Sequence, residues 1–225
     1  MNHFITLKEL SLAASDNITH HGSFKSKQNQ SAFVVRYTSL HNWLAIIDND
    51  YILDSFNYFG IKSAVSNSQI AYQILNGDCS EFQDDLPEEI SQSCENVYAL
   101  LHARYILTGP GLQAMRRKYE SGIFGQCPRF LCQGQNLLPV GESPNLGIAP
   151  VRTFCPKCQD IFESDCEIDG AHFGPSFPHF FLQMNQDLNV ILAEDHFEHN
   201  FFGIPIEKDS DLLKNRIKRG DETST

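Results

Sequence analysis

Apolar positions in the first half of the chain recur at the spacing of a helix. Between residues 40 and 120, apolar side chains repeat every three or four positions, which places them along one helical face. The clearest stripe follows Pro87 and two glutamates, residues typical of a first helical turn. A Gly-Pro-Gly sequence at residues 109–111 predicts its end, because Gly and Pro stop helices. Helices are therefore predicted over residues 69–75, 87–107 and 112–120.

The pattern changes after Cys127. Short apolar segments alternate there with Pro and Gly, which is typical of strands joined by turns. Residues 151–154 and 179–184 are predicted to be strands of a small antiparallel sheet. Further on, residues 200–206 form an apolar run with Gly203 at its centre, which predicts a hairpin tip. The alternative is a last strand that covers the protein's own core.

Two cysteine pairs carry the clearest chemistry. Cys127 and Cys132 form a C-x₄-C pair, and Cys155 and Cys158 form a C-x₂-C pair after twenty-two intervening residues. Two such turns can surround one tetrahedral Zn²⁺ with four thiolates, and this set leaves no open coordination position. Two disulfides would use the same cysteines. However, the seven cysteines are odd in number and the first residues lack a signal-peptide core, so one structural zinc per chain is predicted.

The zinc motif completes an α+β fold class, with a helical N-terminal domain, a small antiparallel zinc-ribbon domain and a C-terminal segment. The start of the chain is rich in Ser, Asn, His and Gln, which is typical of a mobile extension. The predicted parts are the extension, the helical domain, the ribbon and the C-terminal segment with its tail: 1–36, 37–122, 123–193 and 194–225.

Charge and composition narrow the partners. A formal net charge of −11 disfavours nucleic acid, because phosphate binding requires clustered Lys and Arg. No apolar run approaches the ~20 residues of a membrane helix, so no membrane partner is expected. The acidity favours basic proteins or polyamines. Acidic residues crowd the entry to the longest helix, as a binding loop or as a solvated helix start: Asp78, Glu81, Asp84, Asp85, Glu88 and Glu89.

Six short blocks stand in order along the chain: His102-Ala-Arg-Tyr-Ile-Leu-Thr108, Tyr119-Glu-Ser-Gly-Ile-Phe-Gly125, Cys127-Pro-Arg-Phe-Leu-Cys132, Leu138-Pro-Val-Gly141, Cys155-Pro-Lys-Cys158 and Asp169-Gly-Ala-His-Phe-Gly174. Together they closely resemble the casein kinase II regulatory (beta) subunit family. The likeness covers about residues 43–206. The interval between the two cysteine pairs also has the family's length.

The resemblance implies a non-catalytic regulatory subunit of this serine/threonine protein kinase, located in cytoplasm and nucleus. Such a subunit forms a homodimer through its ribbon and binds catalytic alpha subunits, which gives a tetrameric holoenzyme. It stabilises the kinase and changes which substrates are phosphorylated. The resemblance also implies that basic effectors bind the acidic loop. The Ser-Ser-Glu-Glu-type start of the family is absent, which predicts a divergent member or a paralogue.

The resemblance places the dimer surface on the loop between the first two zinc ligands, at Pro128, Phe130 and Leu131. This loop is too short to bury these side chains locally, and a self-complementary apolar patch suits a two-fold dimer. The alternative is that they pack against their own hairpin.

The family's kinase-docking hairpin matches the apolar run near the C-terminus. Its anchor positions and their flanks are Phe201, Phe202, Ile204 and Ile206. The family usually has aromatic residues at both anchors, and Ile204 and Pro205 depart from that pattern. An adaptor that keeps the zinc-dependent dimer but no longer engages the kinase is therefore the alternative function. No catalytic residues are predicted, because Cys79, Cys94 and Cys166 lack a partner motif and the zinc set is full.

Overall fold

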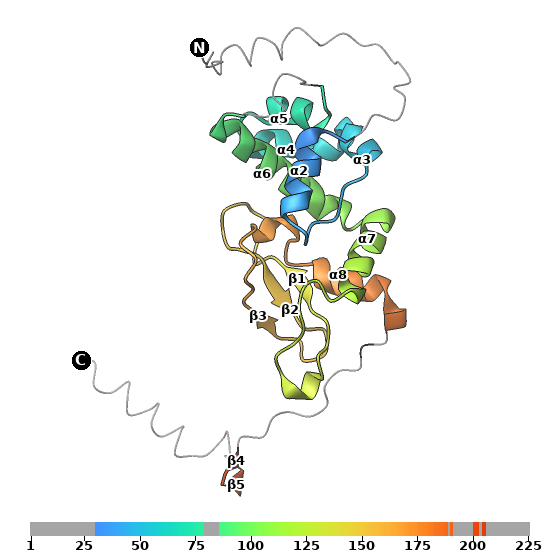
Figure 1. Cartoon of the computed structure of the whole chain (residues 1–225), viewed down its shortest axis with the longest axis vertical. Helices are drawn as coiled ribbons and strands as arrows, with labels where there is room; N and C mark the ends of the chain where they lie inside the picture. Colours follow the sequence, from blue (N-terminus) through green and yellow to red (C-terminus); the bar gives the residue numbers. More distant parts are fainter. Residues whose placement is uncertain (1–29, 79–85, 189, 191–199, 203, 206–225) are drawn as a thin grey trace, which may run out of the picture. The chain divides into compact units, whose positions relative to one another are not determined.

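A computed structural model of the chain describes residues 30–78, 86–188, 190, 200–202 and 204–205 (Figure 1). The chain divides into two compact units, Met1–Leu192 and Ala193–Thr225. The helices of the first unit are α2 (Ala32–Leu40), α3 (Asn49–Leu53), α4 (Ile61–Ala64), α5 (Ser68–Leu75), α6 (Glu88–Tyr105), α7 (Gly109–Glu120) and α8 (Phe177–Met184). Its 3₁₀ turns are η1 (Ser55–Tyr58), η3 (Phe130–Cys132), η4 (Gly170–His172) and η5 (Gln186–Leu188).

Helix α6 is the central element of the helical layer, and it confirms the longest predicted helix. Pro87 precedes it, and Glu88 and Glu89 occupy its first turn. Its apolar stripe is buried, with Val97 and Leu101 at 0% exposure. Helix α5, which confirms the helix predicted at residues 69–75, packs on one side of α6, and η4 packs on it from the sheet layer. None of the described helices is long and apolar enough to cross a membrane.

Helix α2 begins inside the segment predicted to be a mobile extension. The Ser31 side chain caps it by accepting a hydrogen bond from the backbone N–H of Val34 at 3.3 Å. Phe33, Val34 and Tyr37 are buried at three- and four-residue steps, so this helix belongs to the core. The prediction for residues 32–36 was therefore wrong. Residues 1–29 lie outside the described part, and the boundaries predicted at residues 122 and 193 stay predictions.

The Gly-Pro-Gly sequence stops α6, as predicted, but it also starts α7. The Thr108 hydroxyl accepts a hydrogen bond from the N–H of Gly111 at 3.3 Å, and Pro110 fits the first turn. Gly111 has a steric role, because a Cβ atom there would lie 2.0 Å from the Tyr105 carbonyl oxygen. The short link lets α7 start directly against the end of α6.

The second layer contains an antiparallel sheet of β1 (Leu138–Val140), β2 (Arg152–Phe154) and β3 (Ile161–Phe162), in that order. In the β1–β2 pair, Leu138 lies opposite Phe154. In the β2–β3 pair, Thr153 lies opposite Phe162. These strands confirm the predicted small sheet and the strand predicted at residues 151–154. Together with the helices they confirm the α+β fold class.

Residues 179–184, predicted to be a strand, belong to helix α8. Pro178 lies in the first turn of this helix, and Phe177 and Phe181 are both 0% exposed. Their four-residue separation puts both rings on the face that packs against β1. The prediction was wrong because a short, continuous apolar run does not distinguish a buried strand from a buried helix.

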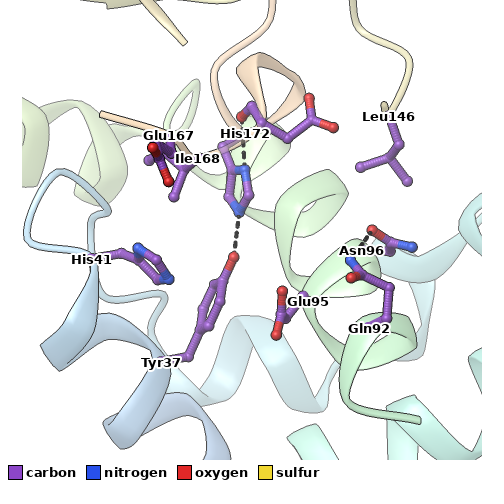
Figure 2. Close-up of a pocket in the computed structure, with 10 residues that line it drawn as sticks. Tyr37, His41, Gln92, Glu95, Asn96, Leu146, Glu167, Ile168 and His172 are labelled. Carbon is purple, nitrogen blue, oxygen red and sulfur yellow. Dashed lines mark hydrogen bonds between the residues drawn. The ribbon is translucent and has the colours of Figure 1, made fainter. Parts of the chain in front are cut away.

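Two buried histidines join the helical layer to the segment that follows the sheet. In α6, Nε2 of His102 accepts a hydrogen bond from Ala45 N–H at 2.9 Å, and Nδ1 donates to the His172 carbonyl at 2.7 Å. The Tyr37 hydroxyl donates to Nε2 of His172 at 3.0 Å (Figure 2). Nδ1 of His172 donates to the Asp169 carbonyl at 2.8 Å. We call these five residues the histidine network.

The histidine network holds both rings neutral. Each ring donates once, to a carbonyl that can only accept, and accepts once. The donor to Nε2 of His102 is a backbone N–H, so this ring has no site for a second proton. Burial lowers the pKa of His102 to about 3 and that of His172 to about 4. The network therefore joins the two layers through fully paired polar groups. A buried polar group that loses its hydrogen bond costs free energy.

Removing the Tyr37 hydroxyl tests the network. We expect Tyr37→Phe to lower the free energy of unfolding by about 1–3 kcal/mol, because Nε2 of His172 then stays buried without a donor. Tyr58→Phe is the matched control, since its buried hydroxyl has no hydrogen-bond partner among the described residues. That change is expected to be neutral or stabilising. Urea unfolding of both variants makes the comparison, and equal effects would contradict the role given to Tyr37.

Candidate metal centre

The four predicted metal-ligating cysteines lie on two loops of similar shape. Cys132 ends η3, and Cys155 follows β2 directly. In each loop the residue after the second cysteine has a left-handed backbone, Gln133 with φ of 53° and Gln159 with φ of 58°. This conformation turns the chain sharply, so that both cysteines of a pair face the same point. The sequence hides this geometry because the left-handed residues are glutamines, not glycines.

The four sulfur atoms form one cluster. All of them lie within 4.8 Å of one another. Sγ of Cys127 is 3.8 Å from Sγ of Cys158, and Sγ of Cys132 is 3.9 Å from Sγ of Cys155. These separations are far longer than the ~2.05 Å of a disulfide, and all four cysteines are free. The disulfide alternative is therefore wrong, and the cluster could hold a metal ion.

The surroundings of the cluster are arranged for bound thiolates. Burial raises the pKa of Cys127, Cys132 and Cys155 to about 11 in the metal-free chain. Burial acts in the same direction on Cys158, but a hydrogen bond from the Asp160 backbone and hydrogen bonds with the other three cysteines together outweigh it, so the pKa of Cys158 is lowered. Backbone groups also hydrogen-bond to the sulfurs of Cys127 and Cys155. A cation at the centre would supply the remaining stabilisation that four thiolates require.

The loop between the first two cysteines presents its apolar side chains outward. Phe130 is 93% exposed and Leu131 is 37% exposed, and Pro128 is exposed as well. The Phe130 side chain therefore does not pack against its own hairpin, so that alternative is wrong for this residue, whereas Leu131 is partly covered. An ion pair between Arg129 and Asp160 ties this loop to the second cysteine loop. We call Pro128, Phe130 and Leu131 the knuckle patch.

The predicted hairpin near the C-terminus is present in the second unit. Strand β4 (Asn200–Phe201) pairs with β5 (Ile204–Pro205), with Phe201 opposite Ile204. Phe202 occupies the tip, with φ of 49° and 92% exposure. Gly203 and Ile206 lie outside the described residues. The docking role of this hairpin stays a prediction.

The acidic cluster is only partly described. Glu81, Asp84 and Asp85 lie outside the described residues. Glu88 and Glu89 are exposed in the first turn of α6, where the helix dipole favours anions. These two positions agree with a solvated helix start, and the binding-loop role stays a prediction.

Sequence reasoning missed the residues that join the two layers. His102 and His172 lie in two of the motif blocks, and Tyr37 is the first residue of the predicted helical domain, but no role was predicted for them. One signal was available for His102, because it continues the four-residue steps of the apolar stripe after Tyr98. Cys94 is fully buried on that stripe, as predicted for a small core residue.

Comparisons with known proteins agree with this architecture. The family of the casein kinase II regulatory subunit matches residues 31–205. Casein kinase II subunit beta of Schizosaccharomyces pombe is 37% identical over 184 residues, which cover 77% of this chain and 80% of the relative. The beta subunit of Dictyostelium discoideum is 36% identical over 80% of this chain and 70% of its own length. The beta′ subunit of Drosophila melanogaster is 38% identical over 71% and 76%. From its fold, its four-cysteine cluster and these similarities, the chain belongs to the casein kinase II regulatory subunit family.

Proposed function

We propose that this chain is a non-catalytic subunit that pairs with itself through a zinc ribbon and docks onto the catalytic alpha subunit of casein kinase II. The observation that carries the proposal is the four-sulfur cluster with an exposed apolar loop beside it. Family membership supports the kinase as partner. We further propose that docking stabilises the kinase and changes its choice of substrates in cytoplasm and nucleus. The net charge of −11 suits basic proteins or polyamines as effectors.

Zinc is the ion that best suits the cluster. A tetrahedral Zn²⁺ with Zn–S bonds of about 2.3 Å separates its sulfur ligands by about 3.8 Å. The Cys127–Cys158 and Cys132–Cys155 sulfur separations, 3.8 and 3.9 Å, agree with that value. Four sulfur ligands fill the coordination sphere, so the ion would stabilise the ribbon. Cys127, Cys132, Cys155 and Cys158 would hold it.

Replacing one sulfur should remove the metal. We expect Cys158→Ser to abolish stoichiometric zinc and unfold the ribbon, because structural zinc contributes on the order of 10 kcal/mol. Cys166→Ser is the matched control, since Cys166 lies outside the cluster and is also half-buried. Elemental analysis of natively purified protein measures zinc per chain. Full zinc in the Cys158 variant, or its loss in both variants, would contradict the assignment.

The knuckle patch is the proposed dimer surface. An aromatic ring that is 93% exposed on a rigid, metal-anchored loop is costly to leave in water. Two copies related by a two-fold axis would cover each other's patch with the same residues. A homodimer would in this way bury Phe130 and Leu131 without any movement of the ribbon.

A charge on the knuckle patch should separate the dimer. We expect Phe130→Glu to weaken self-association by at least about tenfold, because it places a carboxylate in an apolar interface. Phe59→Glu is the control, since it puts the same charge on a phenylalanine that is 81% exposed elsewhere. Sedimentation analysis of the zinc-loaded variants reports their mass. A Phe130 variant that stays dimeric would place the interface elsewhere.

The kinase-docking proposal relies on the hairpin tip. Phe202 follows β4 at the tip of the paired hairpin, and its side chain is 92% exposed. An aromatic anchor of this kind can enter an apolar groove on a partner. The hairpin is paired before binding, which lowers the ordering cost of docking.

Truncating the tip should weaken kinase binding. We expect Phe202→Ala to reduce affinity for the catalytic alpha subunit by roughly 1–3 kcal/mol, while zinc content and dimer mass stay unchanged. Phe56→Ala, at an exposed phenylalanine of the helical layer, should have no effect. Co-purification and titration with the catalytic subunit measure both variants. A zinc-loaded dimer that ignores the kinase would instead support the adaptor, which the departures at Ile204 and Pro205 favour.

A further inference from the structure

A cavity of about 410 Å³ opens between the two layers of the first unit. Helices α2 and α6 form one wall, and the residues before β2 and around η4 form the other. Its volume falls within the range of pockets that take small ligands, about 300–1,000 Å³. It lies away from the cysteine cluster and the knuckle patch, neither of which contributes a lining residue. The proposed function therefore makes no use of it.

The cavity combines negative charge with aromatic surface. Glu95, Glu167 and Asp169 line it, and no lysine or arginine does. Burial lowers the pKa of His41, so that this ring is neutral at pH 7. The rings of Tyr37 and His41 stack edge to face with centroids 4.7 Å apart and form one side. Figure 2 shows these rings and the Glu95 carboxylate lining the same space.

The three carboxylates differ in their exposure and in the hydrogen bonds and ion pairs that they form within the protein. One Asp169 oxygen accepts the Ala171 N–H at 2.8 Å, and the other accepts the Gly147 N–H, so this group holds its own loop. Glu167 is exposed at the rim. Glu95 is half-buried and bonds to Ser91, but it forms no ion pair with a described lysine or arginine.

A cation bound in the cavity would therefore pair with the Glu95 carboxylate. Burial, and then the charge of Glu88, raises the pKa of Glu95, which shows that its anionic form lacks compensation. The same carboxylate also acts on Tyr37, which belongs to the same wall of the cavity. After burial, the charge of Glu95 is the largest cause of the raised pKa of Tyr37. A cation between Glu95 and Tyr37 would contact a carboxylate on one side and an aromatic face on the other.

A planar cation suits this space better than a spherical one. A guanidinium can pair with a carboxylate through two parallel hydrogen bonds and stack on an aromatic ring at the same time. One turn earlier on α6, the Gln92 amide uses its N–H to bond Asn96 at 3.2 Å, which leaves its oxygen as an acceptor. Leu146 and Ile168 supply apolar surface for an alkyl stem. We propose that this cavity binds an alkylguanidinium group.

Binding of butylguanidinium to the zinc-loaded full chain, without any kinase, tests the proposal independently of the proposed function. Butylurea has the same shape without the charge, and calorimetry should show at least about tenfold weaker binding for it. In nuclear magnetic resonance spectra, butylguanidinium should shift the ring signals of His172 and leave those of the exposed His179 unchanged. N-acetylarginine amide is the second probe. Tighter binding of that compound assigns the group to a peptide side chain, and weaker binding assigns it to a free small molecule.

Two matched substitutions locate the contact. Glu95→Gln should weaken butylguanidinium binding by about tenfold, the loss expected for one charge-assisted hydrogen bond. Glu163→Gln removes the same charge from an exposed position outside the cavity and should change affinity by less than about twofold. Glu167→Gln, at the exposed rim, should give a smaller loss than Glu95→Gln. Equal binding of butylurea, equal effects of the Glu95 and Glu163 changes, or no binding to the folded chain would overturn the proposal.

Discussion

The ribbon depends on four sulfur atoms that share one small volume although they come from two distant turns of the chain. Every sulfur lies within 4.8 Å of the others, so the cluster brings the turn at Gln133 beside the turn at Gln159. The strands of this region are short, and β3 contains only two residues. The backbone pairing between its strands is therefore limited. An ion that joins the sulfurs would fix the position of every side chain on both turns.

The side chains in the interior of the chain are enclosed and paired, whereas two of its aromatic rings are exposed. Inside the first unit, polar groups such as His102 and His172 are fully paired, and the apolar side chains of α6 and α8 are enclosed. Yet Phe130 and Phe202 are each more than nine-tenths exposed. Both stand on tightly turned backbone, which gives an apolar ring a defined direction. Rings held this way lose little freedom when another surface covers them.

The sequence predicted the elements with strong local signals and missed those that depend on distant partners. The helix at α6 and the cysteine cluster follow from spacing that a reader can count. The helix at residues 177–184 does not follow from countable spacing. It depends on packing of Phe177 and Phe181 against β1 and α7. The start of α2 was missed because this helix contacts α5 and its Tyr37 pairs with His172, both further along the chain. The cavity at Glu95 has no local signature at all, since its walls come from both layers.

The long reach of the histidine network has a consequence for how the protein is made. Tyr37 and His172 are 135 positions apart, yet their side chains form a buried hydrogen bond with each other. A ribosome releases the helices well before Asp169 and His172 emerge. Until then, Nδ1 of His102 lacks its carbonyl acceptor and the Tyr37 hydroxyl lacks its partner on His172. We thus expect the nascent helical layer to stay loosely packed until the ribbon is synthesised. Misfolding and aggregation are most favoured during that interval.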